Sequence, residues 1–139
     1  INTVMTPGTG AATRAGEAFG KDVELVVCCG GDGTLNETLT GLLRAGADTP
    51  LGYIPTGTTN DFAASMGLSH NPVQAARDIL EGQVNAYDAG RFGDRYFAYV
   101  ASFGAFTRSS YSVPQNIKNA LGHTAYVLGG ISELSQIRN

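Results

Sequence analysis

The stretch VELVVCCGGDGTLNETLTGLL, residues 23–43, decides the fold class of this chain. Its first seven residues, Val23–Cys29, are apolar apart from Glu24, which predicts a parallel strand covered on both faces. After a glycine-rich turn, four leucines recur at i, i+4, i+7 and i+8, the spacing of one buried helix face: Leu35, Leu39, Leu42 and Leu43. A buried strand that runs directly into an amphipathic helix indicates an α/β fold.

The flanking sequence continues the alternation of strands and helices. Ile1–Thr6 resembles the end of a strand, Ala11–Phe19 has helical composition, and Leu51–Ile54 is a second short strand. Asn71-Pro72 provides an N-cap and a first-turn proline for a further helix, which ends at Gly82. Its expected apolar stripe is Val73, Ala76, Ile79 and Leu80. We therefore expect a parallel sheet with flanking helices.

The pattern changes near Asn85, where we expect a domain boundary. Val84–Phe92 and Arg95–Ser102 resemble two strands joined at Gly93-Asp94, which is a hairpin signal. Two residues cannot connect parallel strands, so the chain turns here to an antiparallel arrangement. Residues 1–85 are then expected to form one α/β domain, and residues 86–139 hold too little apolar material to stand alone. That part includes a loop at Pro114 and a helix around 124–137.

Two polar loops follow the two central strands. Gly30–Thr34 and Pro55–Phe62 both mix glycine with hydroxyls and a carboxylate. Parallel strands joined through one helix end at the same edge of the sheet, so Asp32 and Asp61 should face one crevice. Backbone N–H groups at a glycine-rich helix entrance bind phosphate oxygens. The pair of loops therefore predicts a nucleoside triphosphate site for phosphoryl transfer.

Composition and charge narrow the classes of function. The formal net charge of −3 argues against nucleic acid as a partner, and no apolar stretch approaches the ~20 residues of a membrane span. Charged residues make up only 15% of the chain, which indicates either covered faces or a polar uncharged surface. Adjacent Cys28 and Cys29 are expected to be buried apolar residues in a reducing cytoplasm. His70 and His123 have no partner at metal-ligand spacing and are expected to be structural.

Two common nucleotide motifs are missing. The chain lacks Gly-x-x-x-x-Gly-Lys-Ser/Thr, which excludes a P-loop NTPase. It also lacks Gly-x-Gly-x-x-Gly after the strand, so the dinucleotide-dehydrogenase fingerprint fails.

The motifs as a set resemble a known family. GGDGTLNE at residues 30–37 together with PTGTTNDFA at residues 55–63 resembles the diacylglycerol kinase catalytic domain family, which includes bacterial lipid kinases and the sphingosine and ceramide kinases. The first loop alone is shared with NAD kinases and loosely with phosphofructokinases, and the second separates the lipid kinases. Further similarity to the bacterial branch lies in DAG at residues 88–90, SFGAF at residues 102–106 and KNALGHTAY at residues 118–126. The resemblance covers essentially the whole chain.

That resemblance implies ATP and Mg²⁺ as cofactors and a lipid with a free hydroxyl as substrate. It places Asp32 and Asp61 in the catalytic Mg²⁺–water–carboxylate network, with Asp32 as the metal-binding residue. The positions implied in nucleotide binding are Thr6, Gly30, Gly31, Asp32, Gly33, Thr34, Asn36, Gly57, Thr58 and Asn60. Asn60 is expected to orient its loop, and Phe62 to be a core residue.

The same resemblance implies more chain and several partners. Family members begin with an earlier strand and continue well past position 139, and their larger second domain is a β-rich, lipid-binding unit that supplies the catalytic base and a structural Mg²⁺ site. By this resemblance, residues 1–85 are an ATP-binding α/β domain that lacks its first strand, and residues 86–139 are the incomplete beginning of the β-rich domain. The expected location is cytoplasmic, with peripheral contact at the inner face of the membrane, and a homodimer is a further expectation. Two alternatives stay open, an NAD kinase-like enzyme and a nucleotide-binding module without catalysis.

Overall fold

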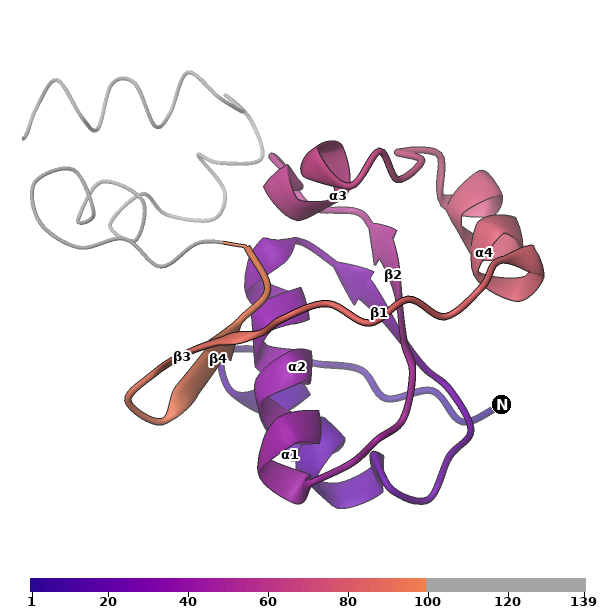
Figure 1. Cartoon of the computed structure of the whole chain (residues 1–139). Helices are drawn as coiled ribbons and strands as arrows, with labels where there is room; N and C mark the ends of the chain where they lie inside the picture. The colour runs from indigo at the N-terminus through magenta and orange to yellow at the C-terminus, as the bar shows by residue number, and fades with distance from the viewer. Residues whose placement is uncertain (100–139) are drawn as a thin grey trace, which may run out of the picture. The chain divides into compact units, whose positions relative to one another are not determined.

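The computed structural model describes residues 1–99, and these residues form four helices and four strands (Figure 1). The element order is α1 (Ala11–Phe19), β1 (Val26–Gly30), α2 (Asp32–Ala45), β2 (Leu51–Pro55), α3 (Asp61–Ser65), α4 (Pro72–Glu81), β3 (Gly90–Phe92) and β4 (Arg95–Phe97). This alternation confirms the expected α/β class. The described residues belong to one compact unit.

Strands β1 and β2 form a parallel pair, as the sequence predicted. Their register runs from Val26 beside Leu51 to Gly30 beside Pro55. The expected strand Val23–Cys29 begins later, at Val26, and it is covered on one face only. Cys28 is buried, whereas the Val27 side chain is 47% exposed. The apolar run predicted cover on both faces, but among residues 1–99 one face of the strand lacks a covering element.

Helices α1 and α2 pack closely because glycines line their contact. The predicted range of α1 is confirmed, and Gly16 of α1 lies against Gly41 of α2. A Cβ on Gly16 would lie 3.0 Å from the carbonyl oxygen of Thr38, and one on Gly41 would overlap the carbonyl oxygen of Thr13. Any side chain at these two positions would push the helices apart.

The buried face of α2 differs in part from the predicted leucine stripe. Leu35 and Leu42 are buried as expected, but Leu43 is exposed and Leu39 is only half-buried. Three residues outside the predicted leucine stripe are buried as well, namely Thr38, Thr40 and Gly41. The helix is covered on two sides, by α1 and by β4, so its buried surface is wider than one leucine stripe. Gly46 ends the helix at φ 64°, as predicted.

Helix α4 begins and ends where the sequence predicted. The side chain of Asn71 accepts hydrogen bonds from the N–H groups of Val73 and Gln74, and the helix stops before Gly82. The predicted apolar stripe is wrong at two positions, because Val73 is 65% exposed and Leu80 is 81% exposed. Ile79 packs over Gly52 of β2, as its place in the predicted stripe requires, and Ala75, which lies outside that stripe, is buried.

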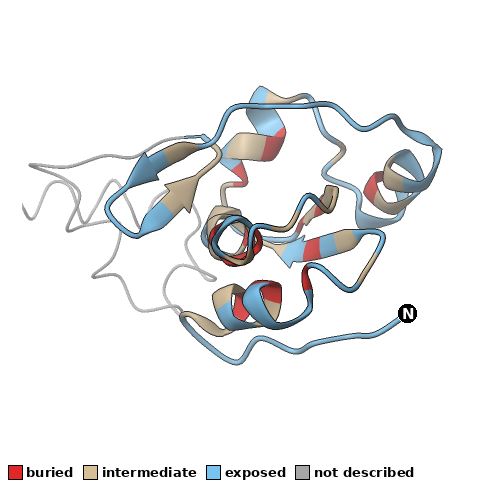
Figure 2. Ribbon diagram, turned by 60° about the horizontal axis from the view of Figure 1, so that its bottom comes forward, coloured by how far each residue is buried: buried red, intermediate tan, exposed pale blue. Residues whose placement is uncertain are grey.

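The predicted strand at Ile1–Thr6 is not formed. Residues 1–7 have no regular structure and are exposed along their length, as the pale blue segment after the N label in Figure 2 shows. A strand needs a neighbour to satisfy its backbone hydrogen bonds. Neither β1 nor β2 pairs with this segment.

The predicted hairpin is present, with shorter strands than expected. Strands β3 and β4 pair antiparallel around Gly93-Asp94, and the hairpin lies beside α2 (Figure 1). The domain boundary near Asn85 stays a prediction. The expected loop at Pro114, the helix at 124–137 and His123 lie outside the described residues.

The core lies beneath the two polar loops. Cys28, Leu35, Tyr53 and Ala63 form a buried cluster, with Leu51, Phe62 and Ala98 packed against it. Phe62 is thus a core residue, as expected, and its ring lies 6.0 Å from that of Tyr53. Each loop ends at an apolar side chain of this core: Leu35 directly follows the first loop, and Phe62 is the last residue of the second.

Two further expectations are settled by burial. Cys28 is buried, and burial raises the pKa of its thiol, but Cys29 is exposed, so the expectation of two buried cysteines is half wrong. Neighbouring residues in a strand point to opposite faces, which separates the two thiols. His70 lies exposed in the loop before α4. None of the helices formed by residues 1–99 is long and apolar enough to cross a membrane.

Candidate nucleotide-binding site

The two polar loops lie against each other, as the parallel topology predicted. The N–H of Thr56 donates to the carbonyl oxygen of Gly30 over 2.8 Å, which extends the pairing of β1 and β2 into the loops. Beyond this bond, Gly57 approaches Gly31 so closely that a Cβ on Gly57 would overlap the Cα of Gly31. The glycine at position 57 therefore has a packing reason that is separate from any ligand.

Asp32 joins the first loop to the helix that follows the second. Its Oδ2 accepts the N–H of Asp61 over 2.9 Å, and its Oδ1 accepts the N–H of Phe62 over 3.0 Å. The hydroxyl of Thr59 lies 3.4 Å from Oδ2. The N-cap residue of α3, Asn60, makes no side-chain cap of its own, so the Asp32 carboxylate takes over that role from 29 residues away.

Asn60 holds the second loop in a tight turn. It is buried and adopts the left-handed conformation, with φ 53° and ψ 49°, which asparagine tolerates better than most residues. Its Oδ1 accepts the N–H of Gly57 over 2.9 Å, and its Nδ2 donates to the Gly57 carbonyl oxygen over 2.9 Å. This geometry fits the expectation that Asn60 orients its loop.

Tyr53 lies under the site, where its environment raises the pKa of its hydroxyl. Its ring is buried, and its hydroxyl lies 3.4 Å from Oδ1 of Asn60. Burial raises the pKa of the Tyr53 hydroxyl above its ordinary value, and the negative charge of Asp32 raises this pKa further. The tyrosine therefore stays protonated beneath the loops.

The N-terminus of α2 offers free backbone donors at the same edge. Gly31 is the N-cap in an extended conformation, and no side chain caps the first turn. Gly33 in that turn is exposed, and a Cβ added there would meet nothing within 4 Å. Unpaired N–H groups and the helix dipole favour an anion at such a terminus. Gly30 differs, because a Cβ there would lie 2.7 Å from the side chain of Thr34.

The remaining predicted residues lie at different distances from this edge. Asp61 and Thr58 are exposed in the second loop, beside the first. Asn36 is one turn further along α2, where its Oδ1 accepts the N–H of Ala98 over 3.1 Å. Thr6 lies in the exposed N-terminal segment, and within residues 1–99 no hydrogen bond joins it to either loop.

The side chains present fit a magnesium ion only with help from a ligand. Among residues 1–99, no three His, Cys, Asp or Glu side chains gather closely enough to hold a metal. Asp32 is the best-placed carboxylate, and each of its oxygens accepts one backbone N–H, so acceptor capacity remains. Mg²⁺ in kinases is bound by one or two carboxylates together with substrate phosphates and water. This edge can provide the carboxylate, and the other ligands would come from a bound nucleotide and solvent.

Comparison with known proteins now identifies the family. The profile of the diacylglycerol kinase catalytic domain matches residues 1–92. The chain belongs to the diacylglycerol kinase catalytic domain family. Membership implies ATP as the phosphate donor, and it agrees with the two loops described above.

Individual relatives agree with this assignment. The chain is 37% identical to a diacylglycerol kinase of Bacillus subtilis (strain 168) over 139 residues, which is 99% of this chain and 46% of the relative. It is 34% identical to a diacylglycerol kinase of Staphylococcus saprophyticus over 128 residues, 92% of this chain and 42% of that protein. The chain therefore spans less than half the length of these relatives.

Solved structures give the same answer for the fold. A crystal structure of a diacylglycerol kinase from Bacillus anthracis str. Sterne superposes with a TM-score of 0.63 at 33% identity. The superposition covers 68% of this chain and 33% of that one. A putative diacylglycerol kinase from the same organism gives a TM-score of 0.60 at 32% identity, over 70% of this chain and 34% of that one.

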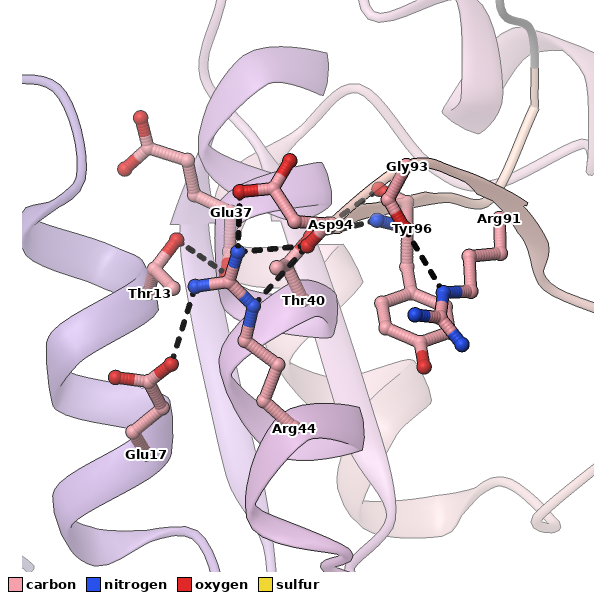
Figure 3. Close-up of polar contacts among 9 residues, drawn as sticks. All are labelled: Thr13, Glu17, Glu37, Thr40, Arg44, Arg91, Gly93, Asp94 and Tyr96. Carbon is pink, nitrogen blue, oxygen red and sulfur yellow. Dashed lines mark hydrogen bonds and ion pairs between the residues drawn. The ribbon is translucent and has the colours of Figure 1, made fainter.

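Sequence reasoning missed two residues that build the surroundings of the site. Thr59 lies beside Asp32, but the motif reading treated it as a spacer. Glu37 accepts the N–H of Gly10 over 2.8 Å through Oε1, and its carbonyl oxygen accepts the hydroxyl of Thr13 over 3.1 Å. Glu37 thereby fixes the start of α1 against α2 (Figure 3). A glutamate at the end of the GGDGTLNE motif was the available signal.

Proposed function

We propose that the whole protein transfers the γ-phosphate of ATP to the hydroxyl of a diacylglycerol-like lipid. The observation that carries this proposal is the hydrogen-bonded contact between the two loops, in a chain that belongs to a lipid kinase family. By the family resemblance, the second loop is the feature that distinguishes lipid kinases from NAD kinases. The alternative of an NAD kinase-like enzyme therefore has less support.

The α2 N-terminus is the proposed phosphate site. Its first-turn N–H groups have no side-chain cap, and Gly33 leaves the backbone accessible. Thr34 and Thr58 supply hydroxyls at the two loops, and Gly31 and Gly57 keep the loops close. Phosphoryl transfer depends mainly on positioning and charge neutralisation, which is the work that such a loop pair performs.

Asp32 and Asp61 have separate proposed roles. Asp32 holds α3 in place through two backbone hydrogen bonds, while the Asp61 side chain is exposed at the edge. When bound, Mg²⁺ would be held by these carboxylates together with ATP, and it would neutralise phosphate charge.

The test is transfer of ³²P from labelled ATP by the full-length protein, with diacylglycerol in mixed micelles and with NAD as the rival acceptor. We expect label in the lipid, and a loss of about 10²-fold in the Asp61→Asn variant. Label in NAD would assign the rival activity. ATP binding without transfer to either acceptor would favour a module without catalysis.

A cytoplasmic location, contact with the inner face of the membrane and a homodimer are further parts of this proposal. Their support is the lipid nature of the proposed acceptor and the family resemblance. Sedimentation with diacylglycerol-containing vesicles tests the membrane contact, and light scattering tests the dimer. Protein that stays in the supernatant, or a monomer mass, would contradict the corresponding part.

A further inference from the structure

Three polar side chains on α2 face the β3–β4 hairpin at four-residue spacing. Asn36, Thr40 and Arg44 follow one another at i, i+4 and i+8, so they lie along one side of the helix. Figure 3 shows Thr40 and Arg44 directed from α2 toward the hairpin. We call these three residues the α2 ladder.

The first two members of the ladder bind the backbone of β4 and the residue after it. The N–H of Tyr96 donates to Oγ1 of Thr40 over 3.0 Å, and the Thr40 hydroxyl is 3.2 Å from the Tyr96 carbonyl oxygen, to which it donates. One turn earlier, Oδ1 of Asn36 accepts the N–H of Ala98 over 3.1 Å. Thr40 is 4% exposed, so its two bonds are shielded from water.

The third member ties the hairpin turn to both helices. The guanidinium of Arg44 donates to the carbonyl oxygen of Asp94 from Nε over 3.1 Å and from Nη2 over 2.6 Å. Nη2 also pairs with the Asp94 carboxylate over 3.0 Å, and Nη1 pairs with Glu17 of α1 over 3.2 Å. Figure 3 shows Arg44 between these two carboxylates.

The repeat of the helix matches the repeat of the strand. Four helical residues advance by about 6 Å, and two strand residues advance by about 6.6 Å. The ladder contacts residues 94, 96 and 98, which are two apart and present their backbone groups to the same edge. A one-residue slip of the hairpin would turn these groups away, so the ladder fixes its register.

We propose that Asn36, Thr40 and Arg44 are positioning residues that hold the hairpin in fixed register with the phosphate loop of α2. The effect that we expect this register to have on catalysis rests on the proposed function. Asn36 was expected to contact nucleotide, and the ladder gives its side chain a different role. Misplacement of about 1 Å far from the chemistry can cost 10²-fold in rate, so loss of register should lower turnover.

The test compares Thr40→Val with Thr38→Val in the full-length protein. Both threonines are buried in α2, but the Thr38 hydroxyl donates within the helix, to the Thr34 carbonyl oxygen over 2.8 Å. We expect Thr40→Val to lower kcat for lipid at least tenfold with ATP affinity within twofold, Thr40→Ser to restore kcat, and Thr38→Val to keep it. Equal kcat in the two valine variants would overturn the proposal.

A second readout does not depend on the lipid activity. Hydrogen exchange of peptides covering residues 90–98, followed by mass spectrometry, reports whether ATP bound at α2 protects the hairpin. We expect ATP to slow exchange at least threefold in the wild type and not in Thr40→Val. No slowing in the wild type, or equal slowing in the variant, would overturn the proposal even if the lipid kinase activity is confirmed. If the expected exchange pattern is seen but no lipid transfer is detected, the result counts against the proposed function and not against the positioning role.

One variant avoids the buried core. Arg44 is partly exposed, so Arg44→Ala should fold while losing the third contact of the ladder. We expect it to reduce the ATP-dependent protection of residues 90–98 and to lower kcat by about threefold to tenfold. Unchanged protection and unchanged kcat would contradict a positioning role for Arg44.

Discussion

Glycines in the two loops have different physical reasons. Gly57 has no room for a side chain, because a Cβ would overlap the Gly31 Cα and lie 2.8 Å from Oδ1 of Asn60. Gly33 has open space around its Cβ position. A packing requirement explains the first glycine. No packing contact explains the second, which fits the proposed approach of ATP to the backbone at Gly33.

Gly57→Ala should therefore destabilise the protein. The added methyl group must move the backbone of one loop, and overpacking of this kind costs about 1–3 kcal/mol. Urea unfolding of the full-length protein, followed by circular dichroism, measures the loss. A midpoint equal to that of the wild type would show that the loops separate without cost, contrary to the observed contact.

The raised pKa of Tyr53 predicts a pH dependence of stability. Below about pH 10, the ordinary pKa of tyrosine, Tyr53 is protonated in both the folded and the unfolded protein, so its contribution is fully present. Above that pH the unfolded state loses its proton first, and the stabilisation falls as pH rises toward the higher folded pKa.

Tyr53→Phe removes this titration. We expect the wild type to be more stable than the variant near neutral pH, by about 0.5–1.5 kcal/mol for the hydroxyl bond to Asn60. The difference should shrink or reverse above pH 10. Urea midpoints of both proteins between pH 7 and 11 measure it. A difference that does not change with pH would contradict the assignment.

At the scale of elements, α3 depends on a residue outside it. Asp32→Asn keeps one acceptor oxygen and replaces the other by an amide that cannot accept a hydrogen bond. We expect the free energy of unfolding to fall by about 1.5–3 kcal/mol, the range for a hydrogen bond to a charged group, and the amides of α3 to exchange faster. Unchanged stability and exchange would contradict the capping role of Asp32.

The capping role of Asp32 also decides which variant can test the chemistry of the site. Asp32→Asn cannot serve as a purely catalytic variant, because it also loosens α3. Asp61→Asn is the better probe of charge at the site, since the Asp61 side chain is exposed and its bond to Asp32 uses the backbone N–H.

The ends of the elements were more predictable than their buried faces. Asn71 and Gly46 act through their own neighbouring backbone, so local sequence was sufficient to place them. Val27, Leu43 and Leu80 are exposed although the pattern predicted burial. Burial depends on which element covers a face, and periodicity does not name that element.

The site was predictable in outline for a topological reason. Parallel strands joined by a helix end at one edge, which brought the two loops together in the prediction and in the structure. The bonds from Asp32 to α3 and from Thr40 to Tyr96 were not predictable, because they join residues 29 and 56 positions apart. Such contacts follow from side-chain packing that a single sequence does not define.

At the scale of the whole molecule, residues 1–99 combine a loop pair, the helix behind it and a hairpin held on that helix. Family membership rests on the match over residues 1–92, and the proposed lipid kinase activity belongs to a protein of which this chain spans less than half by comparison with its relatives. The central claim is that the N-terminus of α2 binds the phosphates of ATP.

Titration of ATP into the full-length wild type and into Gly33→Ala, by calorimetry, tests that claim most directly. Alanine is a better helix residue than glycine by up to about 1 kcal/mol, and its Cβ meets nothing within 4 Å, so the variant should be at least as stable as the wild type. We predict a loss of ATP affinity of about tenfold, or 1.4 kcal/mol, in a protein that remains folded. Equal ATP affinity in the two proteins would contradict the claim.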